Sequence, residues 1–379
     1  MALVLNSEAQ LVRDSALEFF TDKSPILMLR KLRDSRDPDG FSRALWREMA
    51  DLGWTGFLVP EAHGGSEFGM VGLGQVLEAA GRTLAATPLL STALIAASAI
   101  DLAGSEAQKQ KYFPGLISGD TIFALALEES AHHNPNRIAT TAKRDGDGWV
   151  LDGAKRFVID GHVANQLIVV ARTSGGQNDR NGITLFMVPA DAAGVAITRS
   201  SMIDSRNAAR LTLTGVKVAS DAVLGRLDGG ADPLEAVLDR ARAGLAAEML
   251  GSSSEAFERT VQYLKDRKQF GVAIGSFQAL KHRAAQMFCE VEVTRSAVTA
   301  ALAALDENAN DASLLASLAK SKASDTAYLT GNEGVQMHGG IGMTDEHDIG
   351  FFMKRARVTQ AMFGDAAFHR DRYAALTGY

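Results

Sequence analysis

One short stretch of the chain brings together a cation, two aromatic rings and an amide. From Arg267 to Gln278 the sequence reads Arg-Lys-Gln-Phe-Gly-Val-Ala-Ile-Gly-Ser-Phe-Gln. A guanidinium at this place can hold a phosphate through paired hydrogen bonds. The rings of Phe270 and Phe277 and the amide of Gln278 can cover a planar ring or a ribose. A lone Arg beside a Gly would indicate only a surface loop, but this combination favours a binding turn.

A second stretch, Gln336-Met-His-Gly-Gly-Ile-Gly-Met-Thr-Asp-Glu, follows a helical pattern. Gly339 and Gly340 let the backbone approach a ligand closely, and Gln336 offers a side-chain amide one turn earlier. Taken alone, this pattern indicates only a glycine turn at the end of a helix.

Long helical patterns flank the stretch that begins at Arg267. Apolar residues recur at helical spacing from about Asp239 to Asp266, and again from about Ser276 onwards. Gly271 and Gly275 can supply unusual backbone angles between the two patterns. The sequence therefore predicts a bend between two antiparallel helices.

The periodicity of the chain changes twice. Residues 1–120 show helical patterns, residues 121–228 contain short β-rich runs with Asp-Gly hairpin signals, and helical patterns return over 229–379. Strands and helices do not alternate, which excludes a Rossmann fold as the platform for a cofactor. The sequence predicts an α+β multidomain protein with an N-terminal all-α domain, a middle antiparallel β barrel or sandwich, and a C-terminal helical domain.

Composition narrows the classes of partner and compartment. The 379 residues carry a net charge of −6, which argues against nucleic acid as the main partner. Cys289 is the only cysteine, so no intrachain disulfide can form and a reducing compartment is favoured. No apolar run is long enough to span a bilayer, the N-terminus lacks a cleavable apolar core, and the histidines share no ligand spacing. We expect a cytoplasmic enzyme without a membrane segment or a metal site.

The two motifs together resemble the flavin-binding residues of the acyl-CoA dehydrogenases. In that family the Arg267-type turn crosses a subunit boundary and grips the pyrophosphate of a neighbour's FAD, and Gln-x-x-Gly-Gly-x-Gly makes a second contact to the same flavin. The resemblance covers nearly the whole chain, including a C-terminal four-helix bundle. It implies FAD as cofactor, an acyl-CoA substrate and an electron-transfer flavoprotein as electron acceptor. It also implies either a homotetramer or an α2β2 heterotetramer with a related dehydrogenase.

The positions around the expected flavin ring depart from the family pattern. The usual Thr-Glu-Pro becomes Leu127-Glu128-Glu129, and Leu127 has no hydroxyl to bond the flavin. Phe157 stands where relatives carry an aromatic residue and can still pack on the isoalloxazine. Ile159 lacks the hydroxyl that would bond the N5 edge. Phe157 and Ile159 can equally be alternating core residues of a strand.

The usual catalytic base is also missing. The reaction implied by the family removes an α-proton from an acyl thioester while hydride passes from Cβ to flavin N5, so it needs a carboxylate near Cα. Most relatives place that Glu in a Glu-Gly-Thr, where this chain has Phe363-Gly364-Asp365. Other relatives place it directly before an Arg, where this chain has Ala241.

Two carboxylates remain as candidate bases. Glu248 lies seven residues beyond Ala241, on the same helix face, in an apolar run where a Glu is costly unless it is paired or functional. The alternative for Glu248 is a structural ion pair with an Arg such as Arg242 or Arg283. Asp365 is the second candidate, with a polar cap or an adenine contact as its alternative role.

These losses leave two main hypotheses. The first is an FAD-dependent acyl-CoA dehydrogenase that uses Glu248 as an off-pattern base. The second is a partner subunit without a complete site of its own, which lends flavin-facing residues to a different chain: Arg267, Phe270, Gln278, Gln336 and Gly340. In the second case the chain resembles the divergent subunits of heterotetrameric dehydrogenases that act on bulky CoA thioesters, including sterol side chains. A third hypothesis is a flavin oxidase or hydroxylase that uses Asp365.

Overall fold

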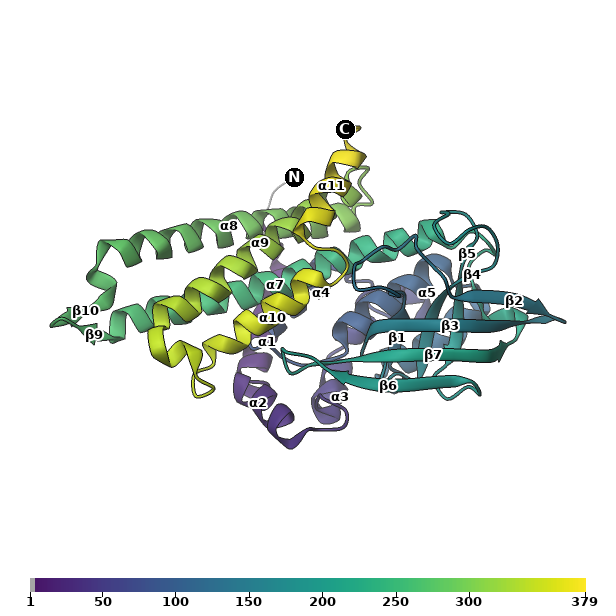
Figure 1. Ribbon diagram of the computed structural model, residues 1–379, viewed down its shortest axis with the longest axis horizontal. Coiled ribbons are helices and arrows are strands. Elements are labelled where there is room, and N and C mark those ends of the chain that lie inside the picture. The colour runs from purple at the N-terminus through teal and green to yellow at the C-terminus, as the bar shows by residue number, and fades with distance from the viewer. Residues whose placement is uncertain (1–3) are drawn as a thin grey trace. The chain divides into compact units, whose positions relative to one another are not determined.

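The computed structural model describes residues 4–379, which form two compact units (Figure 1). A helical unit combines the chain up to Ser35 with Met70–Ala85 and Arg242–Tyr379. A sheet-containing unit combines Arg36–Gly69 with Ala86–Ala241. The two units are defined by which residues contact each other, so each unit combines segments that are separate in the sequence. The predicted division into three consecutive domains, 1–120, 121–228 and 229–379, stays a prediction. The first three residues of the predicted N-terminal domain lie outside the described part of the chain.

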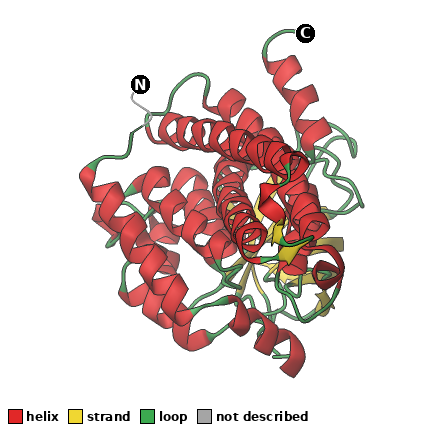
Figure 2. Ribbon diagram, turned by 90° about the vertical axis from the view of Figure 1, so that its left-hand side faces the viewer, coloured by secondary structure: helices red, strands yellow, loops and turns green. Residues whose placement is uncertain are grey.

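The helical unit is built mainly from long helices, several of which appear end-on in Figure 2. Within it, α9 packs against α8, α10 and α11. The elements of this unit are α1 (Ser7–Lys23), α2 (Ile26–Ser35), α4 (Gly69–Arg82), most of α7 (Ala231–Asp266), β9 (Lys268–Gln269), β10 (Val272–Ala273), η5 (Ile274–Ser276), α8 (Gln278–Asp306), α9 (Ala312–His338), η6 (Gly339–Met343), α10 (Ile349–Ala361) and α11 (Ala366–Leu376).

Glycines let α4 and α7 approach each other closely. A Cβ placed on Gly81 of α4 would lie 2.0 Å from the carbonyl oxygen of Glu248 on α7. A Cβ on Gly251 of α7 would lie 1.9 Å from the carbonyl oxygen of Glu78 on α4. Because real side chains never come so near to backbone atoms, only glycine fits at either place. The crossing therefore holds Glu248 in the interior of the unit.

The sheet unit contains one eight-stranded sheet and several short helices. The strands are in the order β6-β7-β3-β2-β4-β5-β8, with β1 paired to β4. The elements are α3 (Arg43–Asp51), η1 (Trp54–Gly56), η2 (Glu61–His63), the π-helix η3 (Leu89–Ala96), α5 (Ala97–Ala103), α6 (Glu106–Ile117), β1 (Phe123–Ala126), β2 (Thr141–Asp145), β3 (Gly148–Ile159), β4 (Gln166–Arg172), β5 (Ile183–Pro189), β6 (Val195–Ser201), β7 (Asn207–Val218), η4 (Ser220–Ala222) and β8 (Val223–Leu224).

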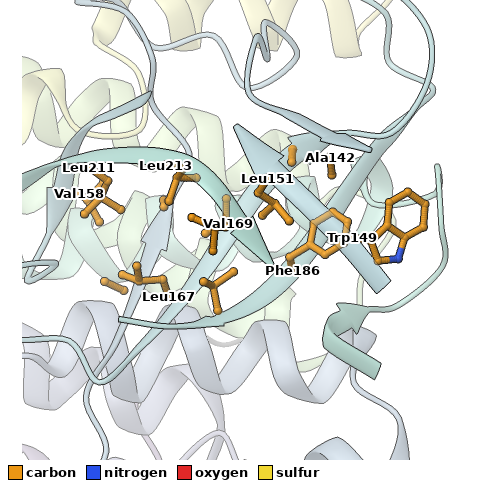
Figure 3. Packing of buried hydrophobic residues seen from close by; sticks show 14 of the residues in the cluster. Ala142, Trp149, Leu151, Val158, Leu167, Val169, Phe186, Leu211 and Leu213 are labelled. Carbon is orange, nitrogen blue, oxygen red and sulfur yellow. The ribbon is translucent and has the colours of Figure 1, made fainter. Parts of the chain in front are cut away.

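The fold class predicted from the sequence is confirmed, with one difference in the sheet. Most strand pairs are antiparallel, but β1 and β2 both run parallel to β4, so the sheet is mixed. Parallel neighbours need a long connection rather than a hairpin, and hairpin signals in the sequence do not report such pairs. Alternating side chains from β3 and β7 meet those of β4 and β5 in one apolar core, which Figure 3 shows around Leu151, Val169 and Phe186.

Candidate functional site

The predicted bend between the two helices is a tight hairpin. Strands β9 and β10 pair antiparallel between the end of α7 and the start of α8. Phe270 and Gly271 at its tip both have left-handed backbones, with φ of 54° and 81°. Two consecutive positive φ values are the signature of the turn that best matches strand twist. Gly275 serves close packing instead, because a Cβ there would lie 2.8 Å from the carbonyl oxygen of Leu264.

The aromatic side chains of this hairpin face solvent. Phe270 is 91% exposed and Phe277 is 39% exposed, and their ring centroids lie 6.1 Å apart at 78°. Arg267 and Gln278 are exposed as well. Large aromatic side chains gathered at an exposed turn are typical of a surface that something else covers. The structure thus brings all four hairpin residues predicted from the sequence onto one short surface.

The end of α9 forms the second exposed element. Gln336 is exposed, and Gly339 ends the helix with φ of 64° and ψ of −141°, a conformation that favours glycine. A Cβ on Gly339 or Gly340 would meet no atom within 4 Å, so open space lies above both residues. The backbone at these two positions is therefore accessible to a ligand.

The two elements meet through Tyr263 and His338. Tyr263 is four residues before Arg267, and His338 directly precedes Gly339. Their rings stack at a centroid distance of 4.3 Å with 29° between the planes. The hairpin and the glycine turn therefore have a common support within the helical unit.

This surface fits part of FAD. An FAD molecule carries a diphosphate, ribose and adenine as well as its flavin ring. An exposed guanidinium suits the diphosphate, exposed rings and amides suit the sugar and base, and open glycine backbone permits close approach. These groups are exposed, so they are accessible to a ligand that approaches from outside the helical unit.

Glu248 lies in a buried ion pair. Both Nε and Nη2 of Arg355 on α10 donate to its Oε1, at 2.9 and 2.8 Å, and each side chain is 5% exposed. A structural ion pair with an Arg was the alternative that the sequence left open, and Arg355 provides one. Arg283 pairs with Glu333 at 2.5 Å, and the guanidinium of Arg242 donates to a backbone carbonyl. The role of Glu248 as a base stays a prediction.

The loop at the family's usual base position is turned inward. Phe363 is only 8% exposed and has φ of 55°. Its carbonyl oxygen accepts hydrogen bonds from Nε of Arg242 at 3.4 Å and from Nε2 of His369 at 3.1 Å. Asp365 caps α11 by accepting from the backbone N–H of Phe368 at 2.8 Å, as its alternative role predicted.

A buried lysine that the sequence pattern does not reveal also holds this loop. Nζ of Lys320 donates to the carbonyl oxygens of Gly364 and Gln360, at 2.9 and 3.3 Å, and to the hydroxyl of Ser324 at 3.1 Å. Burial lowers the pKa of Lys320 to about 7, helped by the nearby charge of Arg242 and opposed by that of Asp365. A Lys in a helix sequence gives no sign of such burial.

In the sheet unit, Phe157 lies at a strained place in β3. It is half-buried with φ of 52°, next to an irregularity in the pairing of β3 with β7 between Lys155 and Val158. Bulky residues rarely adopt positive φ, and such outliers gather at functional sites. The ring is therefore not simply one of the alternating core residues of a strand.

Lys155, next to this irregularity in β3, forms hydrogen bonds to the segment that follows β1. Its Nζ donates to Oε1 of Glu129 at 2.7 Å and to the carbonyl oxygen of Leu127 at 3.2 Å. Burial lowers the pKa of Lys155 to about 8, and the charge of Glu129 opposes this. Burial also disfavours the ionised form of Glu129, but Lys155, together with donors from Thr140 and Ala139, keeps the pKa of that carboxyl below its usual range.

Residues 4–379 offer neither a metal site nor a membrane span. No cluster of three or more His, Cys, Asp or Glu side chains among them is arranged to hold a metal ion. No helix in this part of the chain is both long and apolar enough to cross a bilayer.

Comparison with known proteins agrees with the geometry. Three family models match in order: the acyl-CoA dehydrogenase N-terminal domain at residues 6–120, the middle domain at 124–216 and the C-terminal domain at 228–376. Acyl-CoA dehydrogenase FadE12 of Mycobacterium tuberculosis is 32% identical over 327 residues, which are 83% of each chain.

Two solved structures are similar over almost their whole length. The Tcur3481–Tcur3483 steroid ACAD has a TM-score of 0.88 and 33% identity, covering 98% of this chain and 97% of that one. The ChsE4–ChsE5 complex of Mycobacterium tuberculosis has a TM-score of 0.90 and 27% identity, covering 100% of both chains. The chain therefore belongs to the acyl-CoA dehydrogenase family and shares its cofactor, FAD.

Proposed function

We propose that this chain is the partner subunit of a hetero-oligomeric acyl-CoA dehydrogenase, and that it completes the FAD site of a related catalytic chain. The observation that carries this proposal is Phe363. It stands where most relatives carry the catalytic Glu, and a phenylalanine side chain has no carboxylate that could take up the α-proton. The loop around it is also held inward, because its carbonyl oxygen accepts hydrogen bonds from Arg242 and His369. The exposed hairpin and glycine turn, in contrast, keep the groups that a protomer gives to its neighbour.

In this proposal the residues of the chain bind and orient. Arg267 neutralises the diphosphate, Phe270 and Phe277 cover the sugar and base, and Gln278 and Gln336 donate or accept hydrogen bonds. FAD, when bound, supplies the hydride acceptor for dehydrogenation. A bidentate guanidinium–phosphate contact fixes both position and direction, which suits a cofactor that must present one face to the substrate.

Similarity to a steroid ACAD and to a complex of two different chains supports the hetero-oligomer. We propose an α2β2 assembly that dehydrogenates a bulky CoA thioester and passes its electrons to an electron-transfer flavoprotein. A cytoplasmic location follows from the same proposal and agrees with the single cysteine.

The second candidate is a self-sufficient dehydrogenase in a homotetramer, with Glu248 as base. A carboxylate that is 3% exposed within a helical interior is the feature that favours it. Both Nε and Nη2 of Arg355 donate to its Oε1, so the carboxylate is held in an ion pair inside the helical unit. The ion pair therefore supports the partner-subunit proposal.

Flavin content separates the two candidates. The chain is purified alone and together with a co-expressed related dehydrogenase, and FAD per protomer is read from visible absorbance. The proposal expects a colourless chain alone and a yellow complex, which bleaches on addition of an acyl-CoA. One FAD per protomer in the chain alone, reduced by an acyl-CoA, would overturn it.

A further inference from the structure

Three aromatic rings from different segments form a stack behind the exposed hairpin and glycine turn. Tyr263 of α7 packs on His338 at the end of α9, and His338 packs on His347 at a centroid distance of 4.5 Å. The carbonyl oxygen of Tyr263 accepts the N–H of Arg267 at 2.9 Å. The backbone of Tyr263 is thus hydrogen-bonded to the backbone of the residue that begins the hairpin.

The other end of the stack is joined to the glycine turn. A Cβ on Gly342 would lie 3.0 Å from Cβ of His338 and 2.6 Å from the carbonyl oxygen of Val335. The turn folds back so closely on α9 that it cannot stay in place if His338 moves. Gly339 and Gly340 are therefore positioned by the ring that precedes them.

The hydrogen bonds fit a neutral form of both imidazoles. Nδ1 of His338 donates to the carbonyl oxygen of Gly334 at 2.6 Å, while its Nε2 is buried and has no hydrogen-bond partner in the described chain. Nδ1 of His347 accepts the N–H of Ile349 at 3.2 Å. A neutral imidazole has one donor and one acceptor nitrogen, and this pattern uses each ring in that form.

The charged groups around the stack disfavour a second proton on either ring. From α7, Arg259 faces both histidines. Asp348, directly before α10, carries a negative charge that counteracts the positive charge of Arg259. This carboxylate also interacts with two cations, because Arg30 of α2 donates to its Oδ1 at 2.8 Å and Arg259 forms an ion pair with it. Burial is the main cause that lowers the pKa of His338, followed by the charges of His347 and Arg259, while the hydrogen bond to Gly334 opposes the shift. Burial also lowers the pKa of His347, helped by the charge of Arg259 and opposed by that of Asp348. His347 borders a pocket of about 190 Å³ at the surface of the helical unit, so solvent can reach this member of the stack.

We propose that the Tyr263–His338–His347 stack is a positioning element that keeps the hairpin and the glycine turn in register for the FAD diphosphate, and that acid loosens this grip. The proposal deepens the proposed function and rests on it. His338 and His347 are positioning residues here, since they act through Arg267 and the two glycines.

The direction of the pH effect follows from the neutral stack. Because the pKa of each ring is lowered on folding, the ordered stack is fully stable above the ordinary histidine pKa and loses stability as the pH falls through the lowered value. Protonation of His338 would place a positive charge on a buried ring near Arg259, and its new Nε2–H would have no hydrogen-bond acceptor. Each histidine that takes up a proton is expected to weaken FAD binding by at most about tenfold for each pH unit below its pKa.

The test uses the co-expressed complex and measures retained FAD by absorbance after dilution at pH values from about 7.5 to about 5, on either side of the ordinary histidine pKa. Wild-type complex is expected to release FAD increasingly below about pH 6.5. His338→Phe keeps a stacking ring without a titrating nitrogen, so its FAD retention is expected to vary much less over this range. His338→Ala removes the ring and is expected to release FAD faster at every pH. His282→Asn, which removes an exposed histidine on α8, is the matched control and is expected to follow the wild type.

A second measurement covers the case in which a His338 variant does not fold. His347→Gln alters a less buried member of the stack, and it is expected to move the midpoint of FAD release. NMR titration of the histidine Cε1–H resonances in the same complexes then locates the protons. A wild-type pH profile in His338→Phe, or an unmoved midpoint in His347→Gln, would overturn the inference. If Arg267→Ala also left FAD retention unchanged, the proposed function would fall; if that variant lost FAD, only the stack would be refuted.

Discussion

Two phenylalanines of the helical unit share an unusual backbone and have opposite surroundings. Phe270 and Phe363 have φ of 54° and 55°, yet the first is 91% exposed and the second 8% exposed. Left-handed backbone costs about 1–3 kcal/mol for such residues and persists only where neighbours impose it. At Phe270 a two-residue hairpin imposes it, while at Phe363 buried cations hold the flanking carbonyls.

The difference indicates what each loop is for. The strained hairpin presents the ring of Phe270 and the guanidinium of Arg267 at the surface, where both side chains are exposed. In the loop at Phe363, the carbonyl oxygens of Phe363 and Gly364 instead accept hydrogen bonds from the buried side chains of Arg242, His369 and Lys320. We infer that the first loop serves a ligand and the second serves the fold, and four variants can break or sharpen this contrast.

The largest loss of unfolding free energy is expected from Glu248→Gln, which breaks the buried ion pair with Arg355. Removing one charge leaves Arg355 buried without its partner, which costs about 3–5 kcal/mol of unfolding free energy. Urea unfolding of the chain measures the loss. The double variant Glu248→Met with Arg355→Met is the control, and it should recover most of the stability. A loss below about 1 kcal/mol would show that the pair is not structural.

Arg267→Ala should weaken FAD binding in the complex and leave the stability of the chain nearly unchanged, the opposite of what is expected for Glu248→Gln. The charge-assisted hydrogen bonds to the diphosphate are worth about 1.5–3 kcal/mol, so FAD affinity in the complex should fall between about tenfold and 150-fold. The unfolding free energy should change by no more than about 0.5 kcal/mol, because the side chain is exposed. Lys265→Ala, which changes a cation two residues away, should leave FAD affinity unchanged. Equal FAD affinity in the two variants would contradict the proposed role of the hairpin.

Lys320→Met should change how stability depends on pH. Since folding lowers the pKa of Lys320 from 10.5 to about 7, the unfolded chain binds more protons between those values. The contribution of Lys320 to stability is therefore lowest below about pH 7 and rises with pH until the unfolded pKa is passed, by at most about 1.4 kcal/mol per pH unit. Urea unfolding at several pH values between these limits should show a smaller rise in the variant. Parallel pH profiles would mean that Lys320 is charged throughout.

The smallest effect is expected from Asp365→Ala. Loss of an N-cap costs about 1 kcal/mol, which should appear as a slightly lower denaturation midpoint. Neither FAD content nor reduction of the complex by an acyl-CoA should change. A strong loss of reduction with normal FAD content would make Asp365 a catalytic candidate again.

Much of the fold and part of the site could be predicted from local sequence. Helical periodicity and paired glycines mark the bend after Asp266, and the residue types from Arg267 to Gln278 already suggest a phosphate and a ring. These features are local, because a hairpin and its side chains lie close together along the chain. The positive φ of Gly271 could be predicted from its residue type, because glycine adopts such angles easily. The positive φ of Phe270 could not, because it results from the two-residue length of the turn.

The partners of buried groups could not be predicted. Glu248 pairs with Arg355 on α10, an arginine that the sequence pattern did not single out, and the Arg283 named as a possible partner pairs with Glu333. The burial of Lys320 depends on carbonyls of the loop near Gly364. No periodicity in one helix reports which distant segment packs against it.

The sequence by itself determined the family and the cofactor class and predicts the loss of the usual base, because these depend on which residue types stand at which spacing. Only the tertiary structure decided that Glu248 is paired, that Asp365 caps a helix and that Tyr263, His338 and His347 form one stack. The physical reason is that a buried charge or ring is defined by the groups around it, and packing brings those groups from distant segments. Glu248 and Arg355, for example, are 107 residues apart in the chain.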